Sequence, residues 1–348
     1  MIGTIVMNVR KWPPMENKLY DDKLVVITGA AGFIGSGVVR TLNDRGFTNL
    51  LLVDDFEKSE RWKNLRHKRF ADFISRHDLF DYLKGRETDI EAFVHLGACS
   101  DTTQADGNYL METNYRYSVR LAEYALKHDH RFIYASSAAT YGDGSLGFSD
   151  DESMLDELYT LNLYGFSKQM FDKWLQEQGL LNQVVGLKYF NIFGPNEYDK
   201  GRMASMVMHM TRQIQETGKI LLFQSSDPKR FKDGDQCRDF YYVKDAAKMT
   251  CFFLDHDLSG IFNAGSGKAN TWNKMAEIIF EALGKEVNIE YIPMPEDLVG
   301  KYQNYTCAEM GKFHQGLKDN NWTFQNDFSF EAGVKDYVSN YLLKDERW

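Results

Sequence analysis

The segment Gly29–Gly35, with the sequence GAAGFIG, places the strongest constraint on how this chain folds. It follows the apolar run Leu24–Ile27 and precedes the helix-like segment Ser36–Leu42. Glycines permit a tight turn and close approach of the backbone to a pyrophosphate, and a helix N-terminus offers N–H donors to phosphates. The segment therefore predicts a strand, a glycine turn and a helix that cradle a dinucleotide. An ordinary strand-to-helix turn is the alternative, so support is needed elsewhere in the chain.

Length and composition favour a large α/β protein. The 348 residues are 43% hydrophobic and 14% aromatic, which is enough for one large domain and a smaller lobe. Runs of about eighteen apolar residues are missing, so we expect no membrane span. The segment Met1–Lys23 lacks the apolar region and the cleavage site of a signal peptide. We expect residues 1–19 to form an N-terminal extension.

Cysteine usage and net charge argue against several other classes. Cys99, Cys237, Cys251 and Cys307 are scattered without a CxxC pair, which argues against a metal site and a disulfide framework and favours the cytoplasm. The net charge of −9 disfavours binding to nucleic acid. A phosphate-bearing substrate must therefore be held by local basic residues.

Apolar runs alternate with helical stretches, which is typical of βαβ units and a doubly wound parallel sheet. Further strands are expected at Leu50–Val53, Ala92–His95, Phe132–Ala135, Val184–Leu187 and Gly260–Ala264. Tyr109–His128 has helical periodicity, and the basic segment Lys58–Arg69 is expected to be a solvated loop and helix. We predict a Rossmann-like, NAD(P)-binding domain formed by residues 20–190 plus 239–272.

The pattern changes at Asn191 and predicts a smaller α+β substrate-binding lobe formed by residues 191–238 plus 273–348. Its expected elements are a methionine-rich helix over Met203–Glu216, a strand over Ile289–Ile292 and a closing helix over Phe330–Leu343. Methionines of that kind more often fill a core than bind a ligand. The segment Arg238–Asp245 is strand-like, with a helix beginning at Asp245.

Two features beyond the glycine turn support a dinucleotide site. Asp54 follows the second strand, 19 residues after Gly35, at the distance of a carboxylate that accepts hydrogen bonds from an adenosine ribose. The small-residue loop Leu96–Ser100 follows a later strand and offers a surface on which a dinucleotide can lie. These features favour a cofactor cradle over an ordinary turn.

The catalytic candidates are Ser137, Tyr164 and Lys168. Tyr164 and Lys168 are four residues apart, so on a helix their side chains project from one face. An adjacent ammonium favours the phenolate and lowers the pKa of a tyrosine from about 10 toward neutrality. Ser137 at the end of its strand would hydrogen-bond the reacting oxygen. A YxxxK pair alone is common by chance, and it indicates a catalytic site only in combination with the glycine turn.

These residues resemble those of the extended short-chain dehydrogenases/reductases, which include nucleotide-sugar epimerases and dehydratases. The spacing GxxGxxG in Gly29–Gly35 is part of the same resemblance. Members of the family use Ser/Thr, Tyr and Lys at the positions of Ser137, Tyr164 and Lys168 to move a hydride between sugar and nicotinamide. Sugar dehydratases have Asp-Glu just after the Ser/Thr, where this chain has Ala138 and Ala139, so dehydration is disfavoured.

Five blocks in order resemble a narrower family, the ADP-L-glycero-D-manno-heptose 6-epimerases. These blocks are His95–Ser100, Tyr134–Gly142, Leu187–Pro195, Lys200–Ser205 and Ile289–Pro293. The resemblance implies inversion at C6 of ADP-heptose for the lipopolysaccharide core, through a 6-keto intermediate and return of the hydride to the other face. It also implies a homo-oligomer, since relatives are often pentameric.

The patterns and the resemblance together define the expected binding sites. The cofactor site comprises Gly29, Gly32, Phe33, Ile34, Gly35, Asp54, Asp55, Arg61, Arg76, Leu96, Gly97, Ala98, Cys99, Ser100, Asn114, Tyr164, Lys168 and Ile192. The nucleotide-sugar site comprises Ser137, Asn191, Lys200, Arg202, His209, Phe223, Gln224, Ser225, Ser226, Arg238 and Tyr302. Guanidinium groups of Arg202 and Arg238 suit a diphosphate, and Phe223 suits a base. His209, taken alone, is more often a core histidine.

The resemblance places a second acid/base on Lys200, because re-reduction from the opposite face moves the carbonyl oxygen. A solvated loop lysine is the alternative, and a single tyrosine with a rotating ketose would make Lys200 dispensable. The chain departs from the family at Arg202, where relatives often have serine, and at Pro228–Cys237, which resembles an insertion. Both departures bear on the sugar or base pocket.

Cofactor type and function have alternatives. Asp54 and Asp55 repel a 2′-phosphate and favour NAD, whereas Arg61 and Arg76 resemble family lysines that receive that phosphate. We expect NADP, with NAD as the alternative. The expected activity is that of a nucleotide-sugar 6-epimerase. The alternatives are a UDP- or GDP-sugar 4-epimerase or reductase and a dinucleotide-sensing regulator, which would not need the Ser-Tyr-Lys set.

Overall fold

The structure, a computed structural model, describes residues 22–56, 58–295 and 303–348. The expected extension 1–19 and the candidate residue Tyr302 lie outside the described residues. In the described part of the chain, every helix is too short or too polar to cross a membrane.

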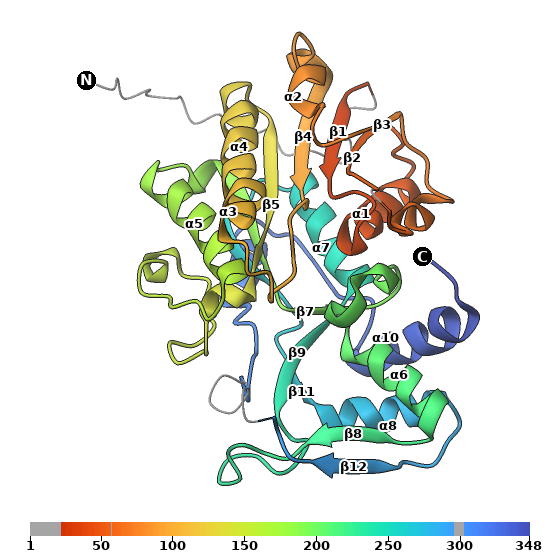
Figure 1. The fold of residues 1–348 in the computed structure, drawn as a ribbon. Coiled ribbons are helices and arrows are strands. Elements are labelled where there is room, and N and C mark those ends of the chain that lie inside the picture. The colour runs from red at the N-terminus through yellow and green to blue at the C-terminus, as the bar shows by residue number, and fades with distance from the viewer. Residues whose placement is uncertain (1–21, 57, 296–302) are drawn as a thin grey trace.

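A seven-stranded parallel sheet forms the larger part of the molecule, with the strand order β10-β6-β5-β4-β1-β2-β3 (Figure 1). Its strands in chain order are β1 (Leu24–Thr28), β2 (Leu50–Val53), β3 (Asp72–Ile74), β4 (Ile90–His95), β5 (Arg131–Ser137), β6 (Val184–Tyr189) and β10 (Gly260–Ala264). The predicted Rossmann-like, doubly wound fold class is therefore confirmed.

Helices cover both faces of this sheet, which explains why its strands are continuously apolar. Neighbouring side chains of β1 point to opposite faces, so Val25 and Ile27 pack in one core with Val38 of α1, while Val26 packs in another core with Phe171. Helices α1 and α7 lie on the first face, and α4 and α5 lie on the second (Figure 1).

The α-helices differ widely in length. They are α1 (Phe33–Asp44), α2 (Leu79–Tyr82), α3 (Gly107–Leu110), α4 (Tyr117–Lys127), α5 (Leu163–Glu177), α6 (Met206–Thr217), α7 (Val243–Asp255), α8 (Trp272–Ala282), α9 (Gly311–Asp319) and α10 (Phe330–Asp336). Tighter or wider helical segments that matter below are η1 (Arg61–Leu65), η3 (Met111–Arg116), η7 (Tyr198–Met203), η8 (Tyr337–Tyr341) and η9 (Leu342–Lys344).

Two smaller sheets build the rest of the molecule (Figure 1). One has the order β11-β9-β7 and the other pairs β12 with β8. Their strands are β7 (Asn191–Phe193), β8 (Ile220–Phe223), β9 (Cys237–Tyr242), β11 (Ala269–Thr271) and β12 (Ile289–Ile292). Met208 and Met210 of α6 are buried in the core between α6, α8 and α10, so the expectation of core-filling methionines is confirmed for these two, whereas Met206 is exposed.

Several local expectations were wrong. Helix α7 begins at Val243 rather than at Asp245, because β9 ends at Tyr242 and Asp245 is buried in the first turn. The segment Lys58–Arg69 contains only the short η1, whose Asn64 and Leu65 are buried rather than solvated. The strand β3 was not expected, because it has only three residues, of which Asp72 is exposed and the other two are half-buried. The division into two domains stays a prediction.

Candidate active site

The glycine turn is closely packed. Gly29 has a φ of +67°, and a Cβ atom on it would lie 2.7 Å from the main-chain nitrogen of Gly97. A Cβ on Gly35 would lie 2.0 Å from the oxygen of Gly29, so α1 approaches β1 only because this residue has no side chain. Gly32 caps the helix, and the first turn of α1 contains no acidic residue. Its unpaired N–H groups therefore suit the phosphates of a dinucleotide.

Asp54 lies at the end of β2 and holds the glycine turn. Its carboxylate accepts hydrogen bonds from the N–H groups of Ala31, at 2.9 Å, and Asp55, at 2.8 Å. Burial raises the pKa of Asp54, although the nearby Arg61 opposes this shift. Asp54 is thus a structural partner of the turn as well as a candidate ribose ligand.

Two arginines flank the aspartates at this edge of the sheet. Arg61 donates a 2.6 Å hydrogen bond to the main-chain oxygen of Asp55, and its guanidinium lies 3.5 Å from Asp54 Oδ1. Arg76 Nε lies 2.8 Å from Asp55 Oδ2. The structure thus brings Asp54, Asp55, Arg61 and Arg76 together, although they come from three separate segments.

The loop that follows β4 lies beside the glycine turn. The N–H of Gly97 donates to Thr28 Oγ1 at 3.1 Å, which places the Leu96–Ser100 loop against β1. Asn114 of η3 is buried and clamps this loop, because it accepts from Cys99 N at 2.8 Å and donates to Cys99 O at 2.9 Å. Its amide also donates to Ser167 Oγ at 3.0 Å. Asn114 therefore links the loop to the helix that carries Tyr164 and Lys168.

Ser137, Tyr164 and Lys168 meet at the carboxyl end of β5. Ser137 is the last residue of β5, and its side chain lies beside the phenol of Tyr164 from α5. Lys168, one turn along α5, donates a 2.7 Å hydrogen bond to the oxygen of Ala135. Ribose hydroxyls and a substrate oxygen are groups that such a set could hold.

The electrostatics of this set differ from the expectation. Burial raises the pKa of Tyr164 above its ordinary value, and the hydrogen bond with Ser137 opposes this shift. The predicted lowering of the Tyr164 pKa by Lys168 is therefore wrong for this structure. Burial lowers the pKa of Lys168 to about 8, against the attraction of Asp172. For both side chains, burial changes the pKa more than the neighbouring side chain does.

A buried polar network under this set was missed from the sequence. Asp172 accepts from Tyr134, at 2.8 Å, and from Ser136, at 2.6 Å. Lys188 Nζ lies 3.9 Å from Asp172 and donates to Thr140 Oγ1 at 2.9 Å. Asp172 follows Lys168 by four residues, so the helical spacing that joined Tyr164 to Lys168 could have found it. Nothing in the spacing points to Lys188.

Lys200 lies in η7, close to the start of α1. Its Nζ is 5.1 Å from the centre of the Phe33 ring. Burial lowers the pKa of Lys200, and the fully buried carboxylate of Glu197 opposes this shift. Glu197 is itself held by Ser205, whose N–H and hydroxyl both donate at 2.5 Å. Lys200 is therefore a half-buried cation beside the glycine turn rather than a solvated one.

The other expected sugar-site residues are spread over the smaller sheets. Arg238 of β9 is buried, with its guanidinium 5.8 Å from the centre of the Trp272 ring. Asn191 begins β7 and accepts from Thr306 at 3.4 Å. His209 is half-buried on α6, which is compatible with either a core or a site role.

The segment 223–226 follows from the end of β8. Phe223 is half-buried, Ser225 N donates to Asp233 Oδ1 at 2.7 Å, and Ser226 Oγ donates to Asn304 Oδ1 at 3.3 Å. Gln224 is exposed, and its N–H donates to the oxygen of Ile292 at 2.8 Å. The segment Pro228–Cys237 thus folds back on residues 223–226 through Asp233.

Arg202 contacts the loop that follows β4, just beyond the candidate residue Ser100. It is 71% exposed, lies 4.0 Å from Asp101 and hydrogen-bonds Thr103. Ile192 of β7 is half-buried and packs against the core of the large sheet. Contact of Arg202 with a diphosphate stays a prediction.

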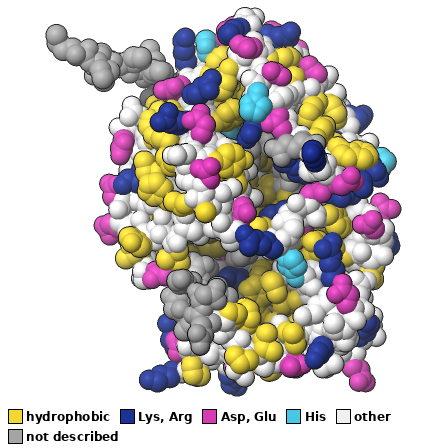
Figure 2. Space-filling view, viewed as in Figure 1, with side chains coloured by type: hydrophobic (Ala, Val, Ile, Leu, Met, Phe, Trp, Pro, Cys, Tyr) yellow, Lys and Arg dark blue, Asp and Glu magenta, His cyan; other side chains and the backbone are white. Residues whose placement is uncertain are grey.

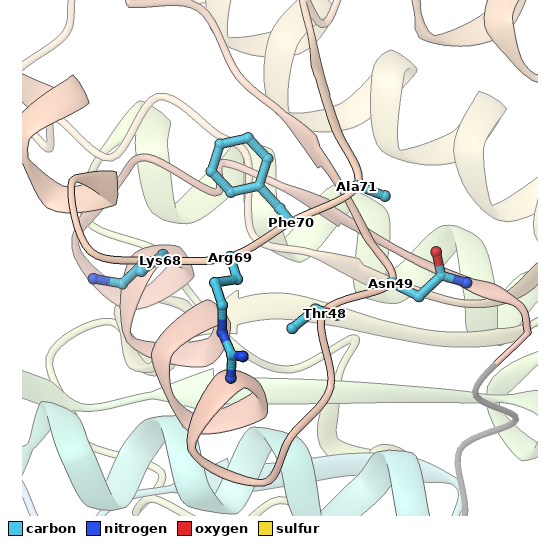
Figure 3. A pocket seen from close by; sticks show the side chains of 6 residues that line it. All are labelled: Thr48, Asn49, Lys68, Arg69, Phe70 and Ala71. Carbon is cyan, nitrogen blue, oxygen red and sulfur yellow. The ribbon is translucent and has the colours of Figure 1, made fainter.

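The surface is hollowed between the large sheet and the smaller sheets, with hydrophobic and basic side chains at the edge of the hollow (Figure 2). A separate surface pocket of about 640 Å³ contains none of the expected site residues. Figure 3 shows its lining residues, which are Thr48, Asn49, Lys68, Arg69, Phe70 and Ala71.

The site combines a glycine cradle, an acidic residue after β2 and a Ser-Tyr-Lys set at the end of β5. This combination defines a dinucleotide-dependent enzyme that acts on an alcohol or a carbonyl group. Comparison with known proteins agrees with this class. The chain belongs to the NAD dependent epimerase/dehydratase family, whose profile matches residues 25–265.

Within this family the chain is similar to ADP-L-glycero-D-manno-heptose-6-epimerases. The protein of that name from Nitratidesulfovibrio vulgaris is 45% identical over 322 residues, which is 92% of this chain and 98% of the relative. The one from Fusobacterium nucleatum is 42% identical over 337 residues, which is 93% of this chain and 100% of the relative. The crystal structure of the one from Helicobacter pylori has a TM-score of 0.76 at 27% identity and covers 94% of this chain and 99% of its own. The resemblance drawn from the five sequence blocks is confirmed.

Proposed function

We propose that the chain inverts C6 of ADP-glycero-D-manno-heptose, interconverting the D-glycero and L-glycero forms, and so supplies heptose for the lipopolysaccharide core. One observation carries this proposal. The chain is 45% identical, over 92% of its length, to a relative named for that reaction. The proximity of Ser137 and Tyr164 supports it, because a hydroxyl beside a phenol suits work on a substrate alcohol.

Ser137 and Tyr164 serve the first half of the proposed reaction. Tyr164, in its phenolate form, takes the proton of the C6 hydroxyl as that carbon becomes a ketone, and Ser137 holds the oxygen. A dinucleotide held by the glycine turn would supply reversible hydride transfer at C6. The ammonium of Lys168 would hydrogen-bond the nicotinamide ribose of that dinucleotide. The reaction is redox-neutral and needs no external reductant.

Lys200 serves the second half. Return of the hydride to the opposite face leaves the oxygen in a different position, where a second acid/base is needed. The Nζ atom lies 5.1 Å from the ring of Phe33, the first residue of α1, so Lys200 borders the dinucleotide site. Burial lowers its pKa, which makes the loss of its proton easier at neutral pH.

The residues of the glycine turn fit a dinucleotide, and we propose NADP, with NAD as the alternative. The N-terminus of α1 would hold the pyrophosphate, and Asp54 and Asp55 would face the adenosine ribose. Arg61 and Arg76 lie beside the two aspartates, where guanidinium groups would attract a 2′-phosphate. The same guanidinium groups also reduce the repulsion between the aspartates and that phosphate.

The nucleotide sugar would bind between the two parts of the molecule. Arg238 and Arg202 are proposed to contact the diphosphate, and Phe223 is proposed to pack against the base. The remaining proposed contacts are Asn191, His209 and residues 224–226. We further propose a cytoplasmic homo-oligomer, with a pentamer as the form to test by light scattering, and the division into the two domains given above.

The decisive experiment incubates the protein with ADP-D-glycero-D-manno-heptose and follows the configuration at C6 by NMR without added reductant. We expect inversion until both epimers are present. Retention of the starting configuration, together with turnover of UDP-galactose, would replace this proposal with that of a 4-epimerase. Binding of a dinucleotide without turnover of either sugar would indicate a regulator.

A further inference from the structure

The segment 345–348 returns from the smaller part of the molecule to α1 (Figure 1). Asp345, with a φ of +52°, ends η9 and redirects the chain. The Trp348 ring packs on Gly37, where a Cβ atom would lie 3.0 Å from Cζ3. The N–H of Trp348 donates to Asn196 Oδ1 at 2.9 Å, and its oxygen accepts from Asn196 Nδ2 at 3.0 Å. The segment is therefore docked through specific contacts.

Arg347 and Glu346 hold the two residues that precede Lys200. Arg347 Nη1 lies 3.3 Å from Asp199 Oδ2, and its guanidinium stacks 4.5 Å from the centre of the Tyr198 ring. The Tyr198 hydroxyl donates to the oxygen of Glu346 at 2.7 Å. The side chains of Arg347 and Asp199 are 19% and 17% exposed, so solvent screens this ion pair less than it would a pair on the open surface.

Arg347 also orients Asn64, which joins the glycine turn to the loop of Lys200. Arg347 Nη1 donates to Asn64 Oδ1 at 2.7 Å. The Asn64 amide nitrogen then faces the oxygens of Ala31, at 2.9 Å, and Asn196, at 3.2 Å. Asn64 is 1% exposed, so its amide has no water to replace a lost partner. One buried amide thus connects the cofactor turn with the start of the Lys200 loop.

We propose that Arg347 is a positioning residue that, through Asn64 and Asp199, fixes Lys200 against the glycine turn. This inference rests on the proposed function, because it assigns the segment 345–348 to the step in which Lys200 acts. A displacement of about 1 Å in a reacting group lowers a rate by up to about a hundredfold. The contacts of Arg347 control such a displacement without touching substrate or dinucleotide.

The test compares Arg347→Ala with Lys344→Ala, a neighbouring substitution at an exposed residue that bonds only Asn340 among described residues. The wild type is first shown to invert ADP-heptose, and an inactive wild type overturns the proposed function and this inference with it. For Arg347→Ala we expect kcat to fall about tenfold or more. KM for ADP-heptose and Kd for the dinucleotide should remain near those of Lys344→Ala, whereas Tm should be lower, because the buried Asn64 Oδ1 loses its partner. Arg347→Lys should recover part of kcat, because it keeps a charge near Asp199.

A double-mutant cycle separates positioning of Lys200 from a general structural role. Adding Arg347→Ala to Lys200→Met should cost no further activity, because the group that Arg347 positions is already missing. If Arg347→Ala lowers kcat by the same factor in the wild type and in Lys200→Met, the inference is overturned. If Arg347→Ala does not fold, Asp199→Asn removes the charge that pairs with Arg347. A folded Asp199→Asn protein should show reduced kcat, and an unchanged kcat would overturn the inference.

Discussion

Lys168 Nζ donates a 2.7 Å hydrogen bond to the main-chain oxygen of Ala135, two residues before Ser137 in the same strand. The bond ties α5 to the end of β5 at the point where Tyr164 meets Ser137. The relative position of phenol and hydroxyl is therefore set by a buried cation and not by the two side chains alone. The predictions below begin from this arrangement.

Replacing Tyr164 with Phe should lower kcat for epimerisation by a factor of about 10² to 10⁴, because the acid/base of the first half-reaction is removed. Tm should change little, because the ring remains. Tyr159→Phe is the matched control, since Tyr159 is 82% exposed and lies five residues away. NMR time courses of epimerisation give kcat, and thermal unfolding gives Tm. Full activity in Tyr164→Phe would contradict its catalytic role.

Lys200→Met should lower kcat by a similar factor of about 10² to 10⁴, because the opposite face then lacks an acid/base. The methionine keeps most of the apolar stem. Lys127→Met, at an exposed residue of α4, serves as the control. NMR time courses give the rate of epimerisation for both variants. An active Lys200→Met enzyme would instead support a single tyrosine and a rotating ketose.

Arg61→Ala and Arg76→Ala should each weaken binding of NADPH by roughly fivefold or more, as expected for loss of a charge-assisted hydrogen bond. Binding of NADH should change much less, because it has no 2′-phosphate. Fluorescence titration with the two dinucleotides provides the comparison. An equal effect on both would show that the arginines only support Asp54 and Asp55.

Gly35→Ala should abolish dinucleotide binding and lower Tm, because its Cβ would lie 2.0 Å from the oxygen of Gly29. Gly311→Ala is the control, since a Cβ there would have no described atom within 4 Å. Calorimetry and NADPH titration measure the two effects. Unchanged binding in Gly35→Ala would be incompatible with the close packing of α1 on β1.

Lys168 should contribute a pH-dependent part of the stability. Its pKa is lowered from the ordinary value of 10.5 to about 8 by burial. Between these values the unfolded chain binds a proton that the folded chain does not, so the free energy of unfolding rises with pH. Comparison of wild type and Lys168→Met by urea unfolding from pH 7.5 to 10.5 should show an extra rise of about 1–3 kcal/mol in the wild type. The same pH dependence of the free energy of unfolding in both proteins would refute the lowered pKa of Lys168.

Much of the large sheet could be predicted from local sequence. The run Leu50–Val53 matches β2 in full, because a strand buried on both faces is apolar throughout. The short, half-buried β3 and the boundary at Val243 could not be predicted, because they depend on neighbouring strands and not on local pattern. The role of Asn64 also has no local signal, since its partners lie 33, 132 and 283 residues away.

The sequence by itself determined the glycine turn and the placement of Tyr164 and Lys168 on one helix, because both depend on spacing within a few residues. It indicated the parallel sheet through the alternation of apolar runs and helical stretches. Tertiary structure alone decided the electrostatics of that pair. Burial raises the pKa of Tyr164 and lowers that of Lys168, and burial depends on packing that no local spacing encodes. The contact between segment 345–348 and the loop of Lys200 was decided in the same way, because it joins residues that only the fold brings together.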